Sequence, residues 1–372
     1  MQFKFKDQAV LLLEDGTTFY GRGFGIKGKS SGEIAFNTGM TGYQEIFTDP
    51  SYFGQILVMT PSHIGNYGIH PEEVESDSVK ISGLVCKEIS DIYSRPAGIE
   101  TVHKYFEKNN IAGICDVDTR ALVRHIRDKG AMNAIISTDE LDIDKLNEMM
   151  KEVPSMQGLE LSSKVACKEA YEVTTENEEF KVAMLDFGLK QNIFRSLVER
   201  GCRVKVFPMT STLEEIKAWN PDGFMLSNGP GDPAAMKSSI DLVKEILSVD
   251  KPVFGICLGH QLMALAENLS TDKMYNGHRG INHPVKNLET GRGEITSQNH
   301  GFVVTKESVE KNDDIEVTHI HLNDDTIQGL KWKNKPAFCV QFHPEASAGP
   351  NDSKYLFDQF TNLMREHKAA LV

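Results

Sequence analysis

The chain has 372 residues, of which 40% are hydrophobic and 25% are charged, and this composition excludes a disordered tail and allows two domains of ordinary size. The formal net charge of −13 argues against a nucleic-acid-binding surface, because phosphate recognition requires clustered Lys and Arg. No apolar run approaches the roughly 20 residues that span a bilayer, so we expect no membrane segment.

The N-terminal half begins with MQFKFKDQAVLLLEDG, whose apolar run is too short for a signal peptide. The six cysteines are scattered without a C-x-x-C pair, which predicts neither a disulfide framework nor a zinc site. Both observations favour a cytoplasmic protein. Apolar runs broken by Gly, Pro and Asp, such as GEIAFNTGMTGY and QILVMTPSHIGNYG, predict short strands and turns up to about residue 150. A helix is expected at 118–129, with Asp118 or Thr119 as its cap.

The second half has a different pattern. Residues 151–180 have the acidic, aperiodic composition of a connector. From Lys181 onward, strand and helix patterns alternate in the order KVAMLDFG, LKQNIFRSLVERG, VKVFP, TLEEIKAW, DGFMLS, SSIDLVKEILS and PVFGIC. The expected fold class is therefore α/β, with a doubly wound, mostly parallel sheet in residues 181–372. A smaller β-rich α+β domain is expected in residues 1–178, with its core ending near residue 150.

A cysteine nucleophile is predicted where the last of these strands turns into a helix. Residues 255–259 read GICLG and have the spacing of a nucleophile elbow with cysteine in place of serine. Backbones approach closely in such a turn, so Gly255 and Gly259 would remove side chains that collide. The helix after Cys257 would point its first N–H groups at the sulfur and favour the thiolate. A buried structural cysteine with packing glycines is the alternative.

A general base and its orienting carboxylate are predicted in FCVQFHPE. Residues i and i+2 of an extended chain face the same side, so His343 and Glu345 would project together, and the carboxylate would fix the imidazole tautomer. A surface turn is the alternative. Among rival histidines, His260 would point along the first helical turn, away from the sulfur, and His300 in SQNHGF could line the pocket. His343 is preferred because only it has an acidic neighbour on the same face.

Backbone donors for an oxyanion are expected in two loops that follow strands. The N–H of Leu258 is one candidate, by the geometry of the elbow. The other lies in SNGPGDP, residues 227–233, whose glycines allow the backbone to approach a substrate closely, although a plain turn would have the same composition. The loop lacks the glycine spacing of nucleotide-binding loops. The joint occurrence of this loop, the cysteine elbow and H-x-E indicates an acyl-transfer site.

These motifs resemble those of a known family. GICLGHQ, SNGPGDP and FHPEAS match the glutaminase signatures of class I, triad-type glutamine amidotransferases. GEIAFNTGMTGYQEIFTDPSY, PSHIGNYGI, DVDTRALVRHIRDKG and SQNHGF are similar to carbamoyl-phosphate synthase small chains, whose N-terminal domain other amidotransferases lack. The resemblance covers nearly the whole chain and is weakest in the connector and the last few residues. It implies the glutaminase subunit of glutamine-hydrolysing carbamoyl-phosphate synthase, which feeds pyrimidine and arginine synthesis.

The resemblance also implies roles for individual residues. Cys257 would attack the side-chain amide of L-glutamine, His343 would move the proton, and Glu345 would orient His343. Water would then hydrolyse the thioester. The positions that the resemblance assigns to glutamine binding are Ser51, Gly229, Gly231, Leu258, Gln261, Asn299, Gly301 and Phe302.

A separate large chain is implied as the partner. Ammonia would pass to it through an enclosed tunnel, and the large chain would make carbamoyl phosphate from bicarbonate and ATP. No metal or cofactor is expected on this chain, since ATP and a divalent metal would belong to the large chain. Heterodimers of small and large chains could associate further.

Two other functions remain open at this point. One is a stand-alone cysteine hydrolase, such as a peptidase of similar sheet topology, which would fit the order of the motifs. In such a protein, SQNHGF and the N-terminal domain would have no assigned function. A non-catalytic binding subunit would be signalled by loss of the cysteine, the histidine or the glutamate, and this chain has all three.

Overall fold

The computed structural model describes residues 7–370. Residues 1–6 and 371–372 lie outside the described part. The former begin the segment considered as a signal peptide, and the latter end the expected second domain. The chain divides into two compact units. The first comprises the residues up to Met156 together with Tyr275–Gly280, and the second comprises Gln157–Met274 and the residues from Ile281 onward.

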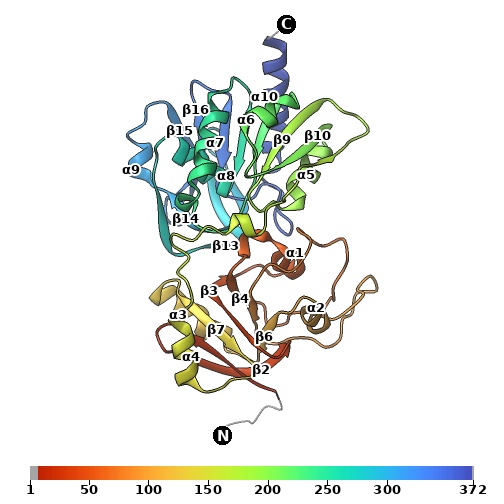
Figure 1. Ribbon diagram of the computed structural model, residues 1–372, viewed down its shortest axis with the longest axis vertical. Coiled ribbons are helices and arrows are strands. Elements are labelled where there is room, and N and C mark those ends of the chain that lie inside the picture. The colour runs from red at the N-terminus through yellow and green to blue at the C-terminus, as the bar shows by residue number, and fades with distance from the viewer. Residues whose placement is uncertain (1–6, 371–372) are drawn as a thin grey trace. The chain divides into compact units, whose positions relative to one another are not determined.

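The first unit is a closed barrel with the strand order β1-β2-β6-β5-β4-β3-β7 (Figure 1). Its strands are β1 (Gln8–Leu13), β2 (Thr18–Gly25), β3 (Lys29–Asn37), β4 (Gln55–Met59), β5 (Gly83–Val85), β6 (Ala112–Cys115) and β7 (Asn133–Ser137). Its helices are α1 (Tyr43–Thr48), η1 (Pro50–Tyr52), α2 (Val102–Lys108), α3 (Thr119–Lys129) and α4 (Ile143–Met150). The β1 strand is buried on both faces, because Leu11 and Leu13 join one hydrophobic cluster while Val10 and Leu12 join a second one that includes residues of α4.

The helix expected at 118–129 is confirmed as α3. Asp118 is its cap, and the Asp118 carboxylate accepts a hydrogen bond from the Ala121 amide at 2.9 Å. Leu122 and Ile126, one turn apart, are buried in the barrel's hydrophobic cluster. The apolar spacing therefore predicted both the helix and the face that it buries.

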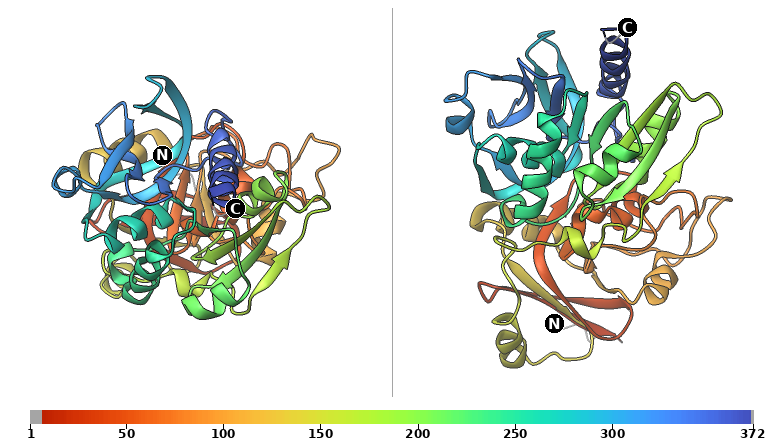
Figure 2. Two further views of the ribbon diagram at one scale, coloured as in Figure 1. Left: turned by 90° about the horizontal axis from the view of Figure 1, so that it is seen from above. Right: turned by 45° about the horizontal axis from the view of Figure 1, so that its top comes forward.

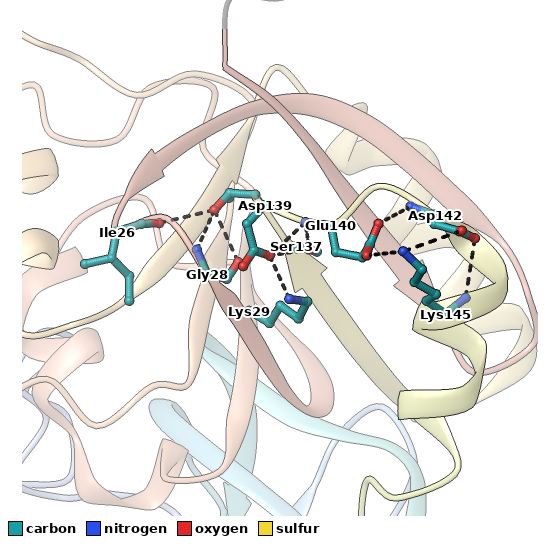
Figure 3. A network of polar contacts seen from close by, with 9 residues as sticks. Ile26, Gly28, Lys29, Ser137, Asp139, Glu140, Asp142 and Lys145 are labelled. Atoms are coloured by element: carbon teal, nitrogen blue, oxygen red, sulfur yellow. Dashed lines mark hydrogen bonds and ion pairs between the residues drawn. The ribbon is translucent and has the colours of Figure 1, made fainter.

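Polar contacts join the ends of β3 and β7 in the first unit (Figure 3). The Lys29 ammonium lies 2.9 Å from a carboxylate oxygen of Asp139, and the Ser137 hydroxyl donates to the same oxygen at 3.1 Å. Lys29 and Ser137 are opposite each other in the antiparallel ladder, which brings the three groups together. The Lys29 and Asp139 side chains are partly exposed, so this ion pair contributes at most about 1 kcal/mol to stability.

The second unit is a mixed sheet in the order β14-β13-β15-β16-β17-β12-β11-β9-β10-β8. Its strands are β8 (Tyr171–Val173), β9 (Phe180–Asp186), β10 (Cys202–Pro208), β11 (Gly223–Leu226), β12 (Val253–Ile256), β13 (Thr271–Asn287), β14 (Gly293–Val304), β15 (Ile315–His321), β16 (Ile327–Trp332) and β17 (Ala337–Val340). Its helices are η2 (Ser162–Lys164), α5 (Gln191–Val198), α6 (Leu213–Ala218), η3 (Pro233–Ala235), α7 (Lys237–Ser248), α8 (Leu258–Ala266), α9 (Lys306–Val309) and α10 (Tyr355–Ala370). The strands β17, β12, β11, β9 and β10 pair in parallel, and β15 and β16 extend the sheet in antiparallel fashion.

Helices cover both faces of this sheet (Figure 2). Alternate residues of β9 point to opposite faces: Ala183 and Leu185 join a hydrophobic cluster with residues of α6, α7 and α8, whereas Val182 and Met184 join one with residues of α5 and α10. A parallel strand buried on both faces reads as a continuous apolar run, as KVAMLDFG does. The expected α/β fold class, with a doubly wound sheet after a smaller β-rich domain, is confirmed.

The segment 151–180 is more than the connector that its composition predicts. β8 lies within it and pairs antiparallel with β10, so that Val173 is opposite Val204. The Glu172 carboxylate also contacts Arg203 at 2.5 Å. An edge strand of three largely exposed residues needs no apolar alternation, because β10 supplies its backbone partners. Among residues 7–370, no helix combines the length and the apolar character needed to cross a bilayer.

Candidate active site

Three neighbouring parallel strands of the second unit end beside one another, and each is followed by a predicted motif. Leu226 of β11 is opposite Gly255 of β12, and Ile256 of β12 is opposite Val340 of β17. The SNGPGDP loop, Cys257 and the H-P-E segment therefore begin at the same edge of the sheet. This is the carboxyl edge, where parallel α/β sheets bind their ligands.

Cys257 occupies a strained turn between β12 and α8. Its backbone angles are φ 53° and ψ −102°, and the side chain is buried. A Cβ atom on Gly259 would lie 2.4 Å from the Leu226 carbonyl oxygen, and one on Gly255 would lie 2.6 Å from the Met263 sulfur. Both glycines therefore have the steric role that the elbow pattern predicts. A positive φ at a non-glycine residue costs energy and is typical of functional turns.

His343 and Glu345 project together after β17. The imidazole Nδ1 lies 2.6 Å from Glu345 Oε1, and both side chains are fully buried. Nδ1 is thereby engaged by the carboxylate, and the Cys257 side chain also interacts with this imidazole. Burial alone would lower the pKa of His343, but the negative charges of Glu345 and Cys257 raise this pKa above its ordinary value of 6.5. The imidazole therefore favours its protonated form once it has taken the Cys257 proton and faces the thiolate.

Lys190 completes this charge network, and the sequence analysis missed it. Its ammonium lies 3.0 Å from Glu345 Oε1 and is itself buried. Burial would raise the pKa of Glu345, but Lys190 and His343 hold it well below its ordinary value of 4.5. Lys190 is the residue before α5, in the short loop that follows β9, and so it also lies at the carboxyl edge of a parallel strand. That position was a signal that could have identified it, since every such loop is a candidate for the site.

The glycine loop lies beside the start of α8. A Cβ atom on Gly229 would lie 2.2 Å from the Phe187 carbonyl oxygen and 2.7 Å from the Leu258 side chain. Gly231 has φ +96° and pairs with Glu160 in an isolated bridge. The segment after residue 156 therefore packs on this loop. Leu258 is the first residue of α8, and its N–H is among those that have no acceptor within a helix.

The β14 strand contributes the remaining neighbours of Cys257. The Cys257 thiol donates to the Asn299 carbonyl oxygen at 3.6 Å, and Gln261 Nε2 donates to the Phe302 carbonyl oxygen at 2.8 Å. The His343 amide donates to the Ser297 carbonyl oxygen at 2.9 Å. The predicted site residues that belong to the second unit are Gly229, Gly231, Cys257, Leu258, Gln261, Asn299, Gly301, Phe302, His343 and Glu345.

Ser51 is the one predicted glutamine-binding residue in the first unit. It lies in η1, where its amide donates to the Asp49 carboxylate at 2.9 Å. Its part in glutamine binding stays a prediction.

The two rival histidines have other contacts. His260 Nδ1 lies 3.0 Å from the sulfur of Cys339, and burial lowers the pKa of His260 to about 3. His300 lies between the Phe302 carbonyl oxygen at 2.8 Å and the Gln298 side chain at 3.0 Å. With its pKa lowered this far, the His260 imidazole is a poor proton acceptor near neutral pH. These contacts support His343 as the base.

Comparisons with known proteins agree with this geometry. A family model for class-I glutamine amidotransferases matches residues 183–363, and a model for the CPSase domain of the carbamoyl-phosphate synthase small chain matches residues 11–136. The fold and the site thus define a class I glutamine amidotransferase that carries an additional N-terminal domain.

Full-length relatives identify the family within this class. The carbamoyl phosphate synthase small chain of Syntrophotalea carbinolica is 48% identical over 374 residues, covering 97% of this chain and 99% of the relative. Those of Aquifex aeolicus and Thermotoga maritima are each 47% identical, covering 95% and 96% of this chain and 98% and 99% of the relatives. The chain belongs to the family of carbamoyl phosphate synthase small chains.

Proposed function

We propose that Cys257, His343 and Glu345 hydrolyse L-glutamine through a γ-glutamyl thioester. The chain is the glutaminase subunit of carbamoyl phosphate synthase, and the ammonia that it releases is passed to the large chain. One observation carries the proposal for the residues: His343 is held by Glu345 at 2.6 Å beside a buried cysteine at a strained elbow.

The first half of the reaction forms the thioester. His343 takes the Cys257 proton, and the sulfur attacks the side-chain amide carbon of glutamine. The resulting oxyanion would accept hydrogen bonds from the backbone N–H groups of Leu258 and of the Gly229 loop. The protonated imidazole then gives its proton to the leaving nitrogen, the carbon–nitrogen bond breaks, and ammonia departs.

The second half restores the enzyme. His343 takes a proton from water, the hydroxide attacks the thioester carbon, and the carbon–sulfur bond breaks to give glutamate and the thiolate. Glu345, kept ionised by Lys190, stabilises the imidazolium in both halves. These steps use side chains and water alone, so the proposal requires no cofactor on this chain and assigns ATP and divalent metal to the large chain.

Glutamine recognition is proposed at the residues around the cysteine. Gly229, Leu258 and Gln261 follow the parallel strands β11 and β12, and the Asn299 and Phe302 carbonyl oxygens contact Cys257 and Gln261, which supports this assignment. Gly231, Gly301 and Ser51 are included in the proposal because of the motif resemblance. We also infer a cytoplasmic location, supported by six cysteines that are all free, and further association of small–large heterodimers.

The test is glutamate release from glutamine by the full chain, with and without a matching large chain. We expect Cys257→Ser to lower the rate at least about a thousandfold, because the alcohol is a far weaker nucleophile at neutral pH. Cys339→Ser is the matched control, since Cys339 is equally buried and also contacts a histidine, and its activity should stay close to that of the native chain.

Two results would contradict the proposal. Unchanged glutamate release in the Cys257→Ser chain would exclude the thioester. Hydrolysis of peptides by the isolated chain, without glutaminase activity beside the large chain, would instead support a stand-alone cysteine hydrolase.

A further inference from the structure

A buried glutamine side chain that the mechanism does not yet use contacts the nucleophile. Gln341 directly follows β17, and its side chain is completely buried. Its Nε2 lies 3.7 Å from the Cys257 sulfur, within hydrogen-bonding distance for sulfur. The pairing of β12 with β17 explains this contact, since the Cys257 amide donates to the Val340 carbonyl oxygen at 2.9 Å and sets the two residues side by side.

The orientation of the Gln341 amide follows from its other contact. Gln261 Nε2 donates to Gln341 Oε1 at 3.0 Å and also to the Phe302 carbonyl oxygen at 2.8 Å. A carbonyl oxygen can only accept, so Nε2 of Gln261 must be the donor in both contacts. The oxygen of Gln341 is therefore turned toward Gln261, and its NH₂ group is turned toward the sulfur.

The Cys257 sulfur thus has an acceptor on one side and a donor on another. As a thiol it donates to the Asn299 carbonyl oxygen at 3.6 Å. As a thiolate it has no proton to donate, and it then gains from the NH₂ group of Gln341, because hydrogen bonds to an ionised acceptor are stronger than neutral ones.

We propose that Gln341 is a positioning residue of the nucleophile, whose side-chain amide donates a hydrogen bond to the Cys257 sulfur and favours the thiolate. The proton leaves the sulfur for Nε2 of His343. The charged groups that act on the sulfur are His343 and, through it, Glu345 and Lys190, whereas Gln341 adds a neutral donor. This inference rests on the proposed function, because it assigns a task within the same site.

The test measures the thiol itself and not turnover. Alkylation of Cys257 by iodoacetamide is followed against pH in the full chain, with and without the large chain, and the modified residue is quantified by mass spectrometry. Other cysteines give little background near neutral pH, because burial raises the pKa of Cys115 to about 11 and those of Cys167 and Cys202 to about 12.

We expect Gln341→Met to slow the alkylation of Cys257 at neutral pH about tenfold and to move the pH profile upward by about one unit, the size of a hydrogen bond to a charged group. Gln341→Glu, which keeps the size but replaces the donor by an acceptor, should move the profile further. Gln328→Met is the matched control, since Gln328 is equally buried and its side chain contacts Gln298 and Thr326.

Circular dichroism and the thermal midpoint establish that each variant is folded. If Gln341→Met fails to fold, the alkylation profile of the isosteric Gln341→Glu variant tests the inference by itself. An unchanged profile in the folded Gln341 variants, or an equal shift in Gln328→Met, overturns the inference. These outcomes are separate from those for the proposed function, because they concern the ionisation of Cys257 whether or not Cys257→Ser still releases glutamate.

Discussion

The second unit contains two buried cysteine–histidine pairs with opposite electrostatics. In the first pair, His343 shares a site with Cys257, and its pKa is raised above its ordinary value. In the second pair, His260 lies 3.0 Å from the Cys339 sulfur. Burial lowers the pKa of His260 to about 3 and raises that of Cys339 well above its ordinary value.

The difference arises from a third and a fourth residue. Desolvation disfavours the charged form of any buried thiol or imidazole, and so a pair left to itself stays neutral. His343 faces Glu345 at 2.6 Å, and Lys190 lies 3.0 Å from the same carboxylate oxygen. A carboxylate held in its ionised form by its own lysine therefore converts a buried cysteine–histidine pair into a candidate acid–base pair.

The largest expected effect is a difference in glutaminase activity between variants of His343 and of His260. His343→Asn should lower kcat for glutamate release about a thousandfold or more, because the proton relay is lost. His260→Leu should leave kcat within about threefold of the native value, since His260 stays neutral and contacts Cys339. The measurement is steady-state glutaminase activity beside the large chain. Similar losses in both variants would contradict the assignment of the base.

The next effect concerns Lys190. Lys190→Met removes one of the two positive charges that compensate the buried Glu345 carboxylate, which should lower the free energy of unfolding by up to about 3–5 kcal/mol. The double variant Lys190→Met/Glu345→Gln should recover much of this loss but no activity. Urea unfolding can be followed by tryptophan fluorescence, because Trp219 and Trp332 both lie in the second unit. Equal stability of the single and double variants would exclude this role for Lys190.

The smallest effect is a difference in acid sensitivity. The pKa of His260 is depressed to about 3 from an ordinary value of 6.5, so the unfolded chain binds more protons between these values. The stability that His260 contributes is complete above pH 6.5 and falls with acidification by up to about 1.4 kcal/mol per pH unit. His260→Leu should remove this slope in urea titrations at pH 6.5 to 4.

His343 should behave in the opposite sense. Its pKa is raised, so its contribution to stability is complete below pH 6.5 and is lost only as the pH rises through the raised pKa. The His343 contribution is measured as the difference in unfolding free energy between the native chain and His343→Asn. If this contribution also fell with acidification between pH 6.5 and 4, the two cysteine–histidine pairs would not differ as described.

Much of the fold followed from local patterns. The apolar runs and glycine stops of the second half predicted β9 to α8 in their order, and the capping position of Asp118 predicted α3. β8 escaped prediction because its Tyr171–Val173 segment is polar and exposed, and an edge strand of this length is defined by its partner β10 and not by its own residues.

The sequence by itself determined the groups whose geometry is set within one element. The glycines around Cys257 predict a close turn, and the spacing of His343 and Glu345 predicts a common face, because steric limits and the period of an extended chain act over a few residues. Family membership followed from the same motifs.

Only the tertiary structure decided which distant groups meet. Lys190 reaches Glu345, Gln341 reaches Cys257, and His260 meets Cys339 because β17 lies beside β12 and the loop after β9 ends at the same edge. Strand order and register depend on the packing of the whole sheet, and no local spacing encodes them. The charge on the candidate base is thus a property of the assembled sheet.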